Sequence, residues 1–179
     1  MKTIKVPTRE DVSPESQELF DKITQKLGKL PNLYAAIGYS PNALKGLLQL
    51  DAALSSGVFS LREREAIYLV VSEVNDCRYC LAAHTITAKN NGFDHDETIN
   101  IRKGISEKAK LSALIRLAKY ITENQGQADP ELLRDFFEAG YKEDALIELV
   151  ALIALRIFTN YVYAVTGVPL DFPEAVSLK

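Results

Sequence analysis

The sequence predicts an all-α protein, a single-domain bundle of about eight helices spanning residues 1–179. Three features lead to this prediction. Helix start and stop signals follow one another along the whole chain. Runs of alternating apolar and polar residues, which half-buried strands require, are almost absent. The 179 residues, 47% hydrophobic and 25% charged, are enough for one hydrophobic core and are typical of a globular protein.

Serine–proline pairs at 13–14 and 40–41 predict the starts of two helices, because the serine caps a helix whose first position the proline occupies. The first helix is expected to end at Gly28 and the second at Gly57, since glycine readily adopts the left-handed conformation that closes a helix. Residues 30–38 between them are expected to form a short helical turn.

A capping box at residues 60–63 predicts the next helix, because its serine and glutamate satisfy each other's backbone amides. This helix is expected to run to about Val74. Asn75 or Asp76 is predicted to cap the helix that follows, which is expected to end at the turn formed by residues 90–92.

The remaining helices are predicted from the same signals. A second capping box, at residues 94–97, predicts a short helix to Gly104. Three further helices are expected, from Ser106 to about Asn124, from Asp129 to Gly140, and from about Lys142 to Thr166 before Gly167.

Charge and hydropathy exclude several classes of partner. The net charge of -3 and scattered basic residues leave no surface to neutralise phosphates, so nucleic acid is not expected. Residues 1–7 lack the apolar core of a signal peptide, which predicts a cytoplasmic location. The apolar segment 145–170 is interrupted by Glu148 and Arg156 and falls short of the roughly 18 uncharged residues of a spanning helix. We expect a buried helix there and no membrane partner.

Both cysteines and one of the two histidines lie in residues 75–84, N-D-C-R-Y-C-L-A-A-H. On a helix, Cys77, Cys80 and His84 share one face. Cα atoms three residues apart in a helix are separated by about 5 Å, within the range of a disulfide. A helix N-terminus also lowers the pKa of a thiol. The spacing therefore favours a redox pair that reduces a peroxide through sulfenic acid and disulfide.

Other interpretations of the cysteines remain open at this stage. A zinc site would need more ligands, because there is one cysteine pair and His84 lies about 10 Å along the helix from Cys77. A thioredoxin-like fold would need strands. Two inert cysteines packed in the core would need neither further ligands nor strands. We predict no metal and no cofactor, and treat His95 as a solvated turn residue.

An acidic residue that orients His84 would complete a relay of nucleophile, base and orienter. The candidates on the preceding helix are Glu63, Glu65 and Glu73. Glu63 is occupied by capping, and Glu73 is near the helix end. Glu65 begins an apolar run and is expected to be partly buried, although a surface salt bridge explains it equally well. The residues alone do not select it.

The segment R-E-R-E-A-I-Y-L-V-V-S-E-V-N-D-C-R-Y-C-L-A-A-H, with Glu65 twelve positions before the first cysteine, resembles the active-site pattern of the AhpD-like alkylhydroperoxidases. These belong to the carboxymuconolactone decarboxylase superfamily, and the resemblance is strongest to its peroxidase-related branch. It is clear over residues 61–92 and extends to F-T-N-Y at residues 158–161.

The resemblance implies an AhpD-like helical fold, assembly into trimers or hexamers, and a thiol-dependent peroxidase that reduces organic hydroperoxides with an unidentified thiol or dithiol donor. It implies that Cys80 is the peroxidatic cysteine, that Cys77 resolves it, and that Glu65 and His84 relay protons. The best-studied members carry a histidine where this chain has Tyr79, and a phenol is a poor base at neutral pH. The alternative is a non-catalytic redox-sensing or ligand-binding protein.

Overall fold

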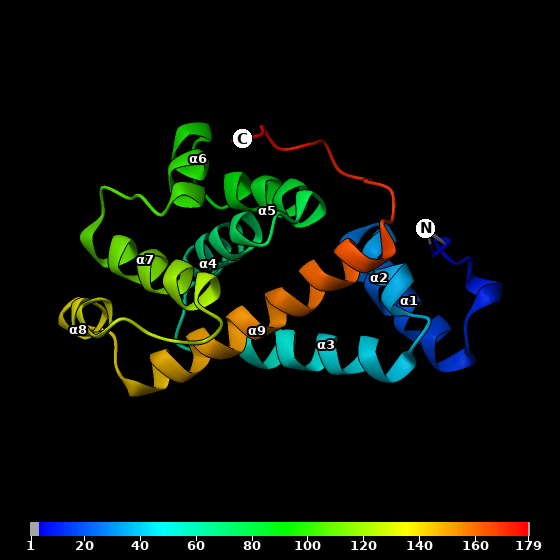
Figure 1. Cartoon of the computed structure of the whole chain (residues 1–179). Helices are drawn as coiled ribbons and strands as arrows, with labels where there is room; N and C mark the ends of the chain where they lie inside the picture. The colour runs from blue at the N-terminus through cyan, green and yellow to red at the C-terminus, as the bar shows by residue number, and fades with distance from the viewer. Residues whose placement is uncertain (1–3, 179) are drawn as a thin grey trace.

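The computed structural model describes residues 4–178, and this part of the chain contains nine α-helices, one short 3-10 helix and no strand (Figure 1). The all-α prediction is therefore confirmed. The elements are the 3-10 helix Arg9–Asp11, α1 (Pro14–Leu27), α2 (Asn32–Ile37), α3 (Pro41–Ser55), α4 (Leu61–Val74), α5 (Arg78–Asn90), α6 (His95–Lys103), α7 (Ala109–Glu123), α8 (Pro130–Glu138) and α9 (Glu143–Thr166).

Most helix boundaries follow the capping signals. Ser13 accepts a hydrogen bond from the backbone of the first turn of α1, and Gly28 closes that helix with φ of 77°. At α4, Ser60 and Glu63 form the predicted reciprocal pair, in which the Ser60 backbone amide donates to the Glu63 carboxylate at 2.9 Å. The expected helical turn at residues 30–38 is α2.

Two predicted helix starts are wrong. The cap of α5 is Cys77 rather than Asn75 or Asp76, because the Cys77 sulfur accepts the backbone amide of Cys80 at 3.3 Å. Helix α7 begins at Ala109 rather than at Ser106, whose hydroxyl instead accepts the amide of Lys108 at 3.2 Å in the preceding turn. In both cases the predicted capping residue lies in the connection before the helix.

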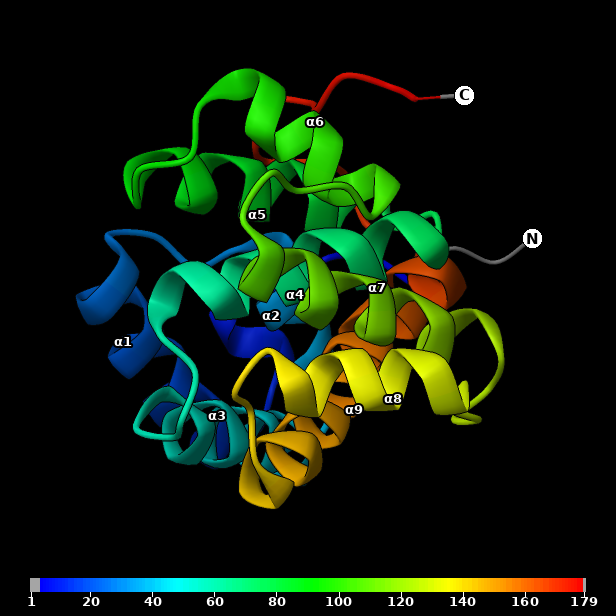
Figure 2. The same ribbon diagram turned by 90° about the vertical axis from the view of Figure 1, so that its left-hand side faces the viewer.

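Helix α4 is the centre of the bundle. Every residue from 65 to 72 is buried, and the helix packs against α5, α6, α7 and α9. Helix α9 lies between the α1–α3 group and the α4–α7 group (Figure 1), and α8 lies beside α7 at one edge (Figure 2). The two longest apolar segments of the sequence thus meet in the core, where a buried side chain is worth about 1.5–3 kcal/mol.

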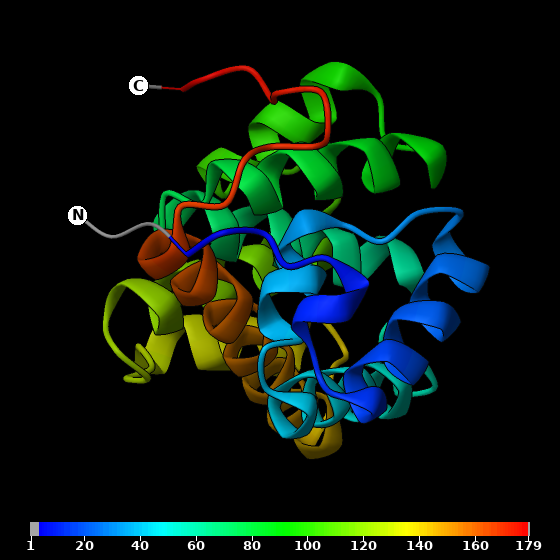
Figure 3. The ribbon, with the colours of Figure 1, turned by 90° about the vertical axis from the view of Figure 1, so that its right-hand side faces the viewer.

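Helix α9 is the one helix among residues 4–178 that is long and apolar enough to cross a membrane. Its Leu149, Leu152 and Ile153 side chains instead lie in the protein core, as predicted for this segment. Beyond α9, the C-terminal segment, residues 167–178, turns back across α5 toward α6 (Figure 3). Arg78 pairs with Glu174 there, and Arg102 donates to the carbonyl of Val176 at 2.7 Å.

Candidate active site

The two cysteines lie at the N-terminus of α5, in the interior of the protein. Cys77 is 1% exposed and Cys80 is 2% exposed, and both are free thiols. Cys77 precedes the helix as its cap, and Cys80 is in the first turn with His84 one turn further on. The predicted common face therefore holds for Cys80 and His84, which line the same cavity, while Cys77 lies behind them.

The environment makes the two sulfurs unequal. A hydrogen bond from Cys77, with further contributions from the Arg156 and His84 charges, lowers the pKa of Cys80 to about 6 despite its burial. The same hydrogen bond, together with burial, raises the pKa of Cys77. Near neutral pH, Cys80 is thus the thiolate and Cys77 the proton-bearing partner. A lowered cysteine pKa was expected from the helix N-terminus, but the neighbouring groups contribute to it directly.

Glu65 and His84 form a pair beside the cysteines. Glu65 on α4 is 3% exposed, and its carboxylate lies 2.8 Å from Nδ1 of His84 on α5. The Tyr68 ring packs against the imidazole with centroids 4.9 Å apart. A carboxylate on Nδ1 fixes the orientation of the ring and leaves Nε2 as the nitrogen free for proton transfer.

The other two acidic candidates are engaged elsewhere. Glu63 accepts the hydroxyl of Tyr141 at 2.7 Å as well as capping α4. Glu73 forms an ion pair with Arg102 at 2.7 Å. Of the three candidate glutamates, only Glu65 therefore contacts His84. Glu65 is fully buried, whereas partial burial was expected.

Residues of helix α9, which lie outside the cysteine motif, also surround Cys80. The Thr159 hydroxyl lies 3.9 Å from the Cys80 sulfur. The Asn160 side chain donates to Ser72 at 3.3 Å and accepts from Asn75 at 2.9 Å, and its hydrogen bonding contributes to the lowered pKa of Cys80. Thr159 and Asn160 are the middle of F-T-N-Y, the one sequence signal for these residues.

Cys80 opens onto a cavity of about 260 Å³ with mostly apolar and aromatic walls. The walls come from the α1–α2 connection, α2, α5, α9 and the C-terminal segment. The lining residues are Leu27, Lys29, Pro31, Leu33, Tyr34, Tyr79, Cys80, Ala83, His84, Thr87, Arg156, Thr159 and Phe172. A cavity of this character suits a small organic molecule rather than a water-like one.

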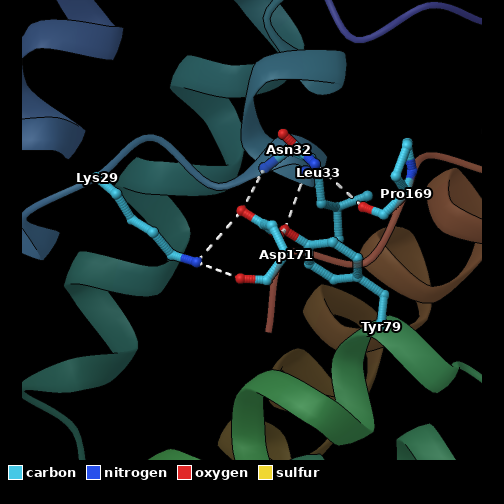
Figure 4. A network of polar contacts seen from close by, with 6 residues as sticks. All are labelled: Lys29, Asn32, Leu33, Tyr79, Pro169 and Asp171. Carbon is cyan, nitrogen blue, oxygen red and sulfur yellow. Dashed lines mark hydrogen bonds and ion pairs between the residues drawn. The ribbon is translucent and has the colours of Figure 1, made fainter. Parts of the chain in front are cut away.

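Tyr79 has a structural role at the edge of this cavity (Figure 4). Its hydroxyl donates to Asp171 at 2.5 Å and accepts the backbone amide of Leu33 at 3.2 Å. Asp171 also accepts from the amide of Asn32 and pairs with Lys29 at 3.3 Å. Tyr79 thus ties α5 to α2 and to the C-terminal segment.

The part of the chain that the structure describes contains no group of three or more His, Cys, Asp or Glu residues that could hold a metal ion. His95, the other histidine, lies at the exposed start of α6. The polar groups at Cys80 are those of the Glu65–His84 pair and of α9.

The family model "Carboxymuconolactone decarboxylase family" matches residues 41–120, from the start of α3 into α7. A crystal structure described as an uncharacterized peroxidase-related protein from Silicibacter sp. TM1040 superposes with a TM-score of 0.80 over 96% of this chain and 91% of that one, at 21% identity. The chain therefore contains a segment similar to the carboxymuconolactone decarboxylase family, within a fold shared with these solved structures.

Two further solved structures share this fold. One, described as an alkylhydroperoxidase AhpD core and an uncharacterized peroxidase-related protein from Ralstonia eutropha JMP134, has a TM-score of 0.82 at 17% identity, covering 94% of this chain and 92% of that one. The other, the debrominase Bmp8 C82A in complex with 2,3,4-tribromopyrrole, has a TM-score of 0.80 at 22% identity, covering 96% and 93%. No curated protein sequence matches the chain.

Proposed function

We propose that this protein is a thiol-dependent peroxidase that reduces organic hydroperoxides through a cycle of the Cys77–Cys80 dithiol and disulfide. The proposal is carried by one observation: a cysteine whose pKa is lowered to about 6 faces an apolar cavity, with a second thiol hydrogen-bonded behind it. A thiolate is the nucleophile in such chemistry, and a nearby thiol protects it from overoxidation.

In the first step the Cys80 thiolate attacks the terminal oxygen of the hydroperoxide. An S–O bond forms, the O–O bond breaks, and sulfur is oxidised to sulfenic acid while the alkoxide leaves. The alkoxide takes a proton to become the alcohol, and His84, held by Glu65 at 2.8 Å, is placed to deliver it. The Glu65 carboxylate stabilises the protonated imidazole during the transfer.

In the second step the Cys77 sulfur attacks Cys80. The S–S bond forms and the S–O bond breaks, and hydroxide leaves as water with the proton that Cys77 gives up. An external dithiol then returns two electrons and two protons. The net reaction consumes one hydroperoxide and one dithiol, and yields one alcohol, one water and one disulfide.

The shape of the cavity supports an organic substrate. Leu33, Ala83 and Phe172 give walls that bind an alkyl or aryl group but make no hydrogen bonds to hydrogen peroxide. We expect kcat/KM for cumene hydroperoxide to exceed that for hydrogen peroxide by about tenfold or more, since each well-buried apolar group contributes about 1–3 kcal/mol.

The proposal is tested by steady-state turnover of cumene hydroperoxide with a panel of thiol and dithiol donors. Wild-type protein should consume peroxide in proportion to donor, and Cys80→Ser should abolish turnover. Cys77→Ser should lose donor-dependent turnover yet still form sulfenic acid at Cys80. Unchanged peroxide consumption by Cys80→Ser would overturn the proposal.

A non-catalytic redox sensor is the alternative that the sequence left open. The almost complete burial of both sulfurs favours it, because an external donor must reach a cysteine that is 1–2% exposed. It predicts stoichiometric disulfide formation without turnover by any donor. Sustained turnover by even one dithiol rejects it.

Reductive debromination is a second candidate activity, favoured by the superposition with a debrominase and by the aromatic rings of Tyr34, Tyr79 and Phe172 in the cavity. A dithiol supplies the two electrons that, with one proton, exchange C–Br for C–H and release bromide. Bromide release from a bromopyrrole by the reduced protein, absent in Cys80→Ser, would support it.

Assembly into a homo-oligomer is also proposed, following the trimers or hexamers that the superfamily resemblance implies. Ile147, Tyr161 and Val165 on α9 are 59–75% exposed, which is unusual for large apolar side chains on one helix. Light scattering should give a trimer or hexamer for the wild type, and Val165→Glu should lower the mass. A monomeric wild-type protein would contradict this.

A further inference from the structure

The molecule contains two buried arginines with different surroundings. Arg102 is 4% exposed and is neutralised by an ion pair with Glu73 at 2.7 Å. Arg156 is 7% exposed, yet no carboxylate among residues 4–178 lies within ion-pair distance of it. Burying a charge without a counter-ion is costly. Arg156 therefore requires negative charge from another group in its surroundings.

The groups that touch Arg156 are neutral. Its guanidinium lies 3.9 Å above the centre of the Tyr68 ring, and Nη1 donates to the Thr159 hydroxyl at 3.4 Å. Nε is buried without a hydrogen-bond partner. Burial raises the pKa of the Tyr68 phenol and raises that of Tyr34 to about 12, so both rings are uncharged near neutral pH.

Two groups near Arg156 can carry negative charge: the Glu65 carboxylate, which already pairs with His84 at 2.8 Å, and the Cys80 thiol, whose interaction with Arg156 is the larger. Cys80 shares the Thr159 hydroxyl with Arg156, and both residues line the same cavity. In the reduced protein the Cys80 thiolate is therefore the counter-ion of the buried guanidinium. Forming the Cys77–Cys80 disulfide removes this negative charge but leaves Arg156 in place. In the oxidised protein the negative charge that remains near Arg156 is that of Glu65, which is shared with His84, at the wall of an apolar cavity.

We propose that Arg156 is an anion-binding residue whose counter-ion changes with the redox state: the Cys80 thiolate in the reduced protein, and the carboxylate of a small apolar ligand in the disulfide form. Leu33, Ala83 and Phe172 supply the apolar walls for the body of that ligand. The inference rests on the proposed function only in using the same disulfide, and it requires no turnover. It predicts that the cavity changes its ligand preference with each oxidation.

Calorimetric titration with hexanoate and with hexan-1-ol, its neutral counterpart, tests the inference. Wild-type protein oxidised with diamide should bind hexanoate at least about tenfold more tightly than the reduced protein, because a close charge pair contributes well over the 1.4 kcal/mol that a factor of ten requires. Hexan-1-ol should bind both forms equally. Equal hexanoate affinity in the two redox states would overturn the inference.

Two sets of variants separate charge from shape. Cys77→Ser/Cys80→Ser has no thiolate and no disulfide, so it should bind hexanoate as the oxidised wild type does, whatever the redox conditions. Arg156→Gln in oxidising conditions should lose at least about tenfold in affinity, while Arg102→Gln, the matched loss of a buried arginine outside the cavity, should not. Hexanoate binding that persists in Arg156→Gln would overturn the assignment.

The result also separates this inference from the proposed function. A protein that reduces hydroperoxide but binds hexanoate equally in both redox states keeps the function and loses the anion site. A protein that binds hexanoate only when oxidised, yet never turns over peroxide with any donor, keeps the anion site and loses the function.

Discussion

The residues of two walls of the cavity are distributed differently along the sequence. On one wall, Cys80 and His84 line the cavity from α5, and Glu65 on α4 supports His84 from behind; these residues lie within 20 consecutive positions. On the other, Arg156 and Thr159 come from α9, more than 70 residues later in the chain. In the proposed mechanism the first wall supplies the nucleophile and the proton relay, and the second supplies a charge that stabilises the thiolate.

This difference shows what each wall contributes to reactivity. The α4–α5 wall alone has a thiol at a helix N-terminus, an arrangement that stabilises a negative charge by about 0.3–2 kcal/mol. The cation on α9 and the thiol of Cys77 act directly on the Cys80 sulfur. Removing Arg156 therefore tests thiolate formation, whereas removing His84 removes the proposed proton donor together with a smaller contribution to the lowered Cys80 pKa.

The largest effect, after loss of Cys80 itself, is expected on the α4–α5 wall. His84→Ala and Glu65→Gln should each lower kcat/KM for cumene hydroperoxide by on the order of 10²-fold or more, since both break one proton relay. The double variant should be little worse than either single one. His95→Ala, which removes the exposed histidine, is the control and should retain wild-type activity. Additive losses would mean that the two residues act separately.

An intermediate effect is expected on the α9 wall. In the wild type, kcat/KM should fall as the pH drops through about 6, because the thiolate is then protonated. Arg156→Gln should move this midpoint upward, toward the ordinary cysteine value of about 8.5, because the cation that favours the thiolate is gone. Ultraviolet absorbance of the thiolate against pH measures it, and an unmoved midpoint would contradict a role for Arg156.

The smallest effect is expected at Tyr79, which ties α5 to α2 and to the C-terminal segment. Tyr79→Phe removes the hydrogen bond to Asp171 and should lower the free energy of unfolding by about 1.5 kcal/mol. Hydrogen exchange in residues 168–178 should become faster, while the midpoint of Cys80 titration stays near 6. Tyr163→Phe is the matched control, because its ring packs on Tyr79 with centroids 5.7 Å apart but its hydroxyl lies outside this network.

The sequence allowed the fold and one wall to be predicted because both depend on local signals. Capping boxes and the glycines that end helices are patterns of only a few residues. Cys80 and His84 lie on one face because they are four residues apart on a helix. The sequence alone did not decide which of three glutamates pairs with His84, because only tertiary packing brings Glu65 to it. Arg156 was read merely as an interruption of an apolar helix, because no local pattern reveals that a buried cation faces a thiol on another helix.

Tyr79 shows a further limit of reading the motif alone. As a replacement for a histidine it looked like a missing base, yet its hydroxyl joins segments that are 46 and 92 residues away in the chain. Aromatic residues at helix positions are usually interpreted as packing, and this one packs and donates a hydrogen bond at the same time. Its role could be found only once the C-terminal segment was placed beside α5.

The central claim is that Cys80 attacks and Cys77 resolves. Intact-mass and peptide mass spectrometry of the reduced protein after one equivalent of cumene hydroperoxide tests it most directly. The wild type should lose two hydrogens, with Cys77 linked to Cys80, and Cys77→Ser should gain one oxygen at Cys80. A wild-type protein that stays reduced, or a Cys77→Ser variant that is not oxidised at Cys80, would contradict the account.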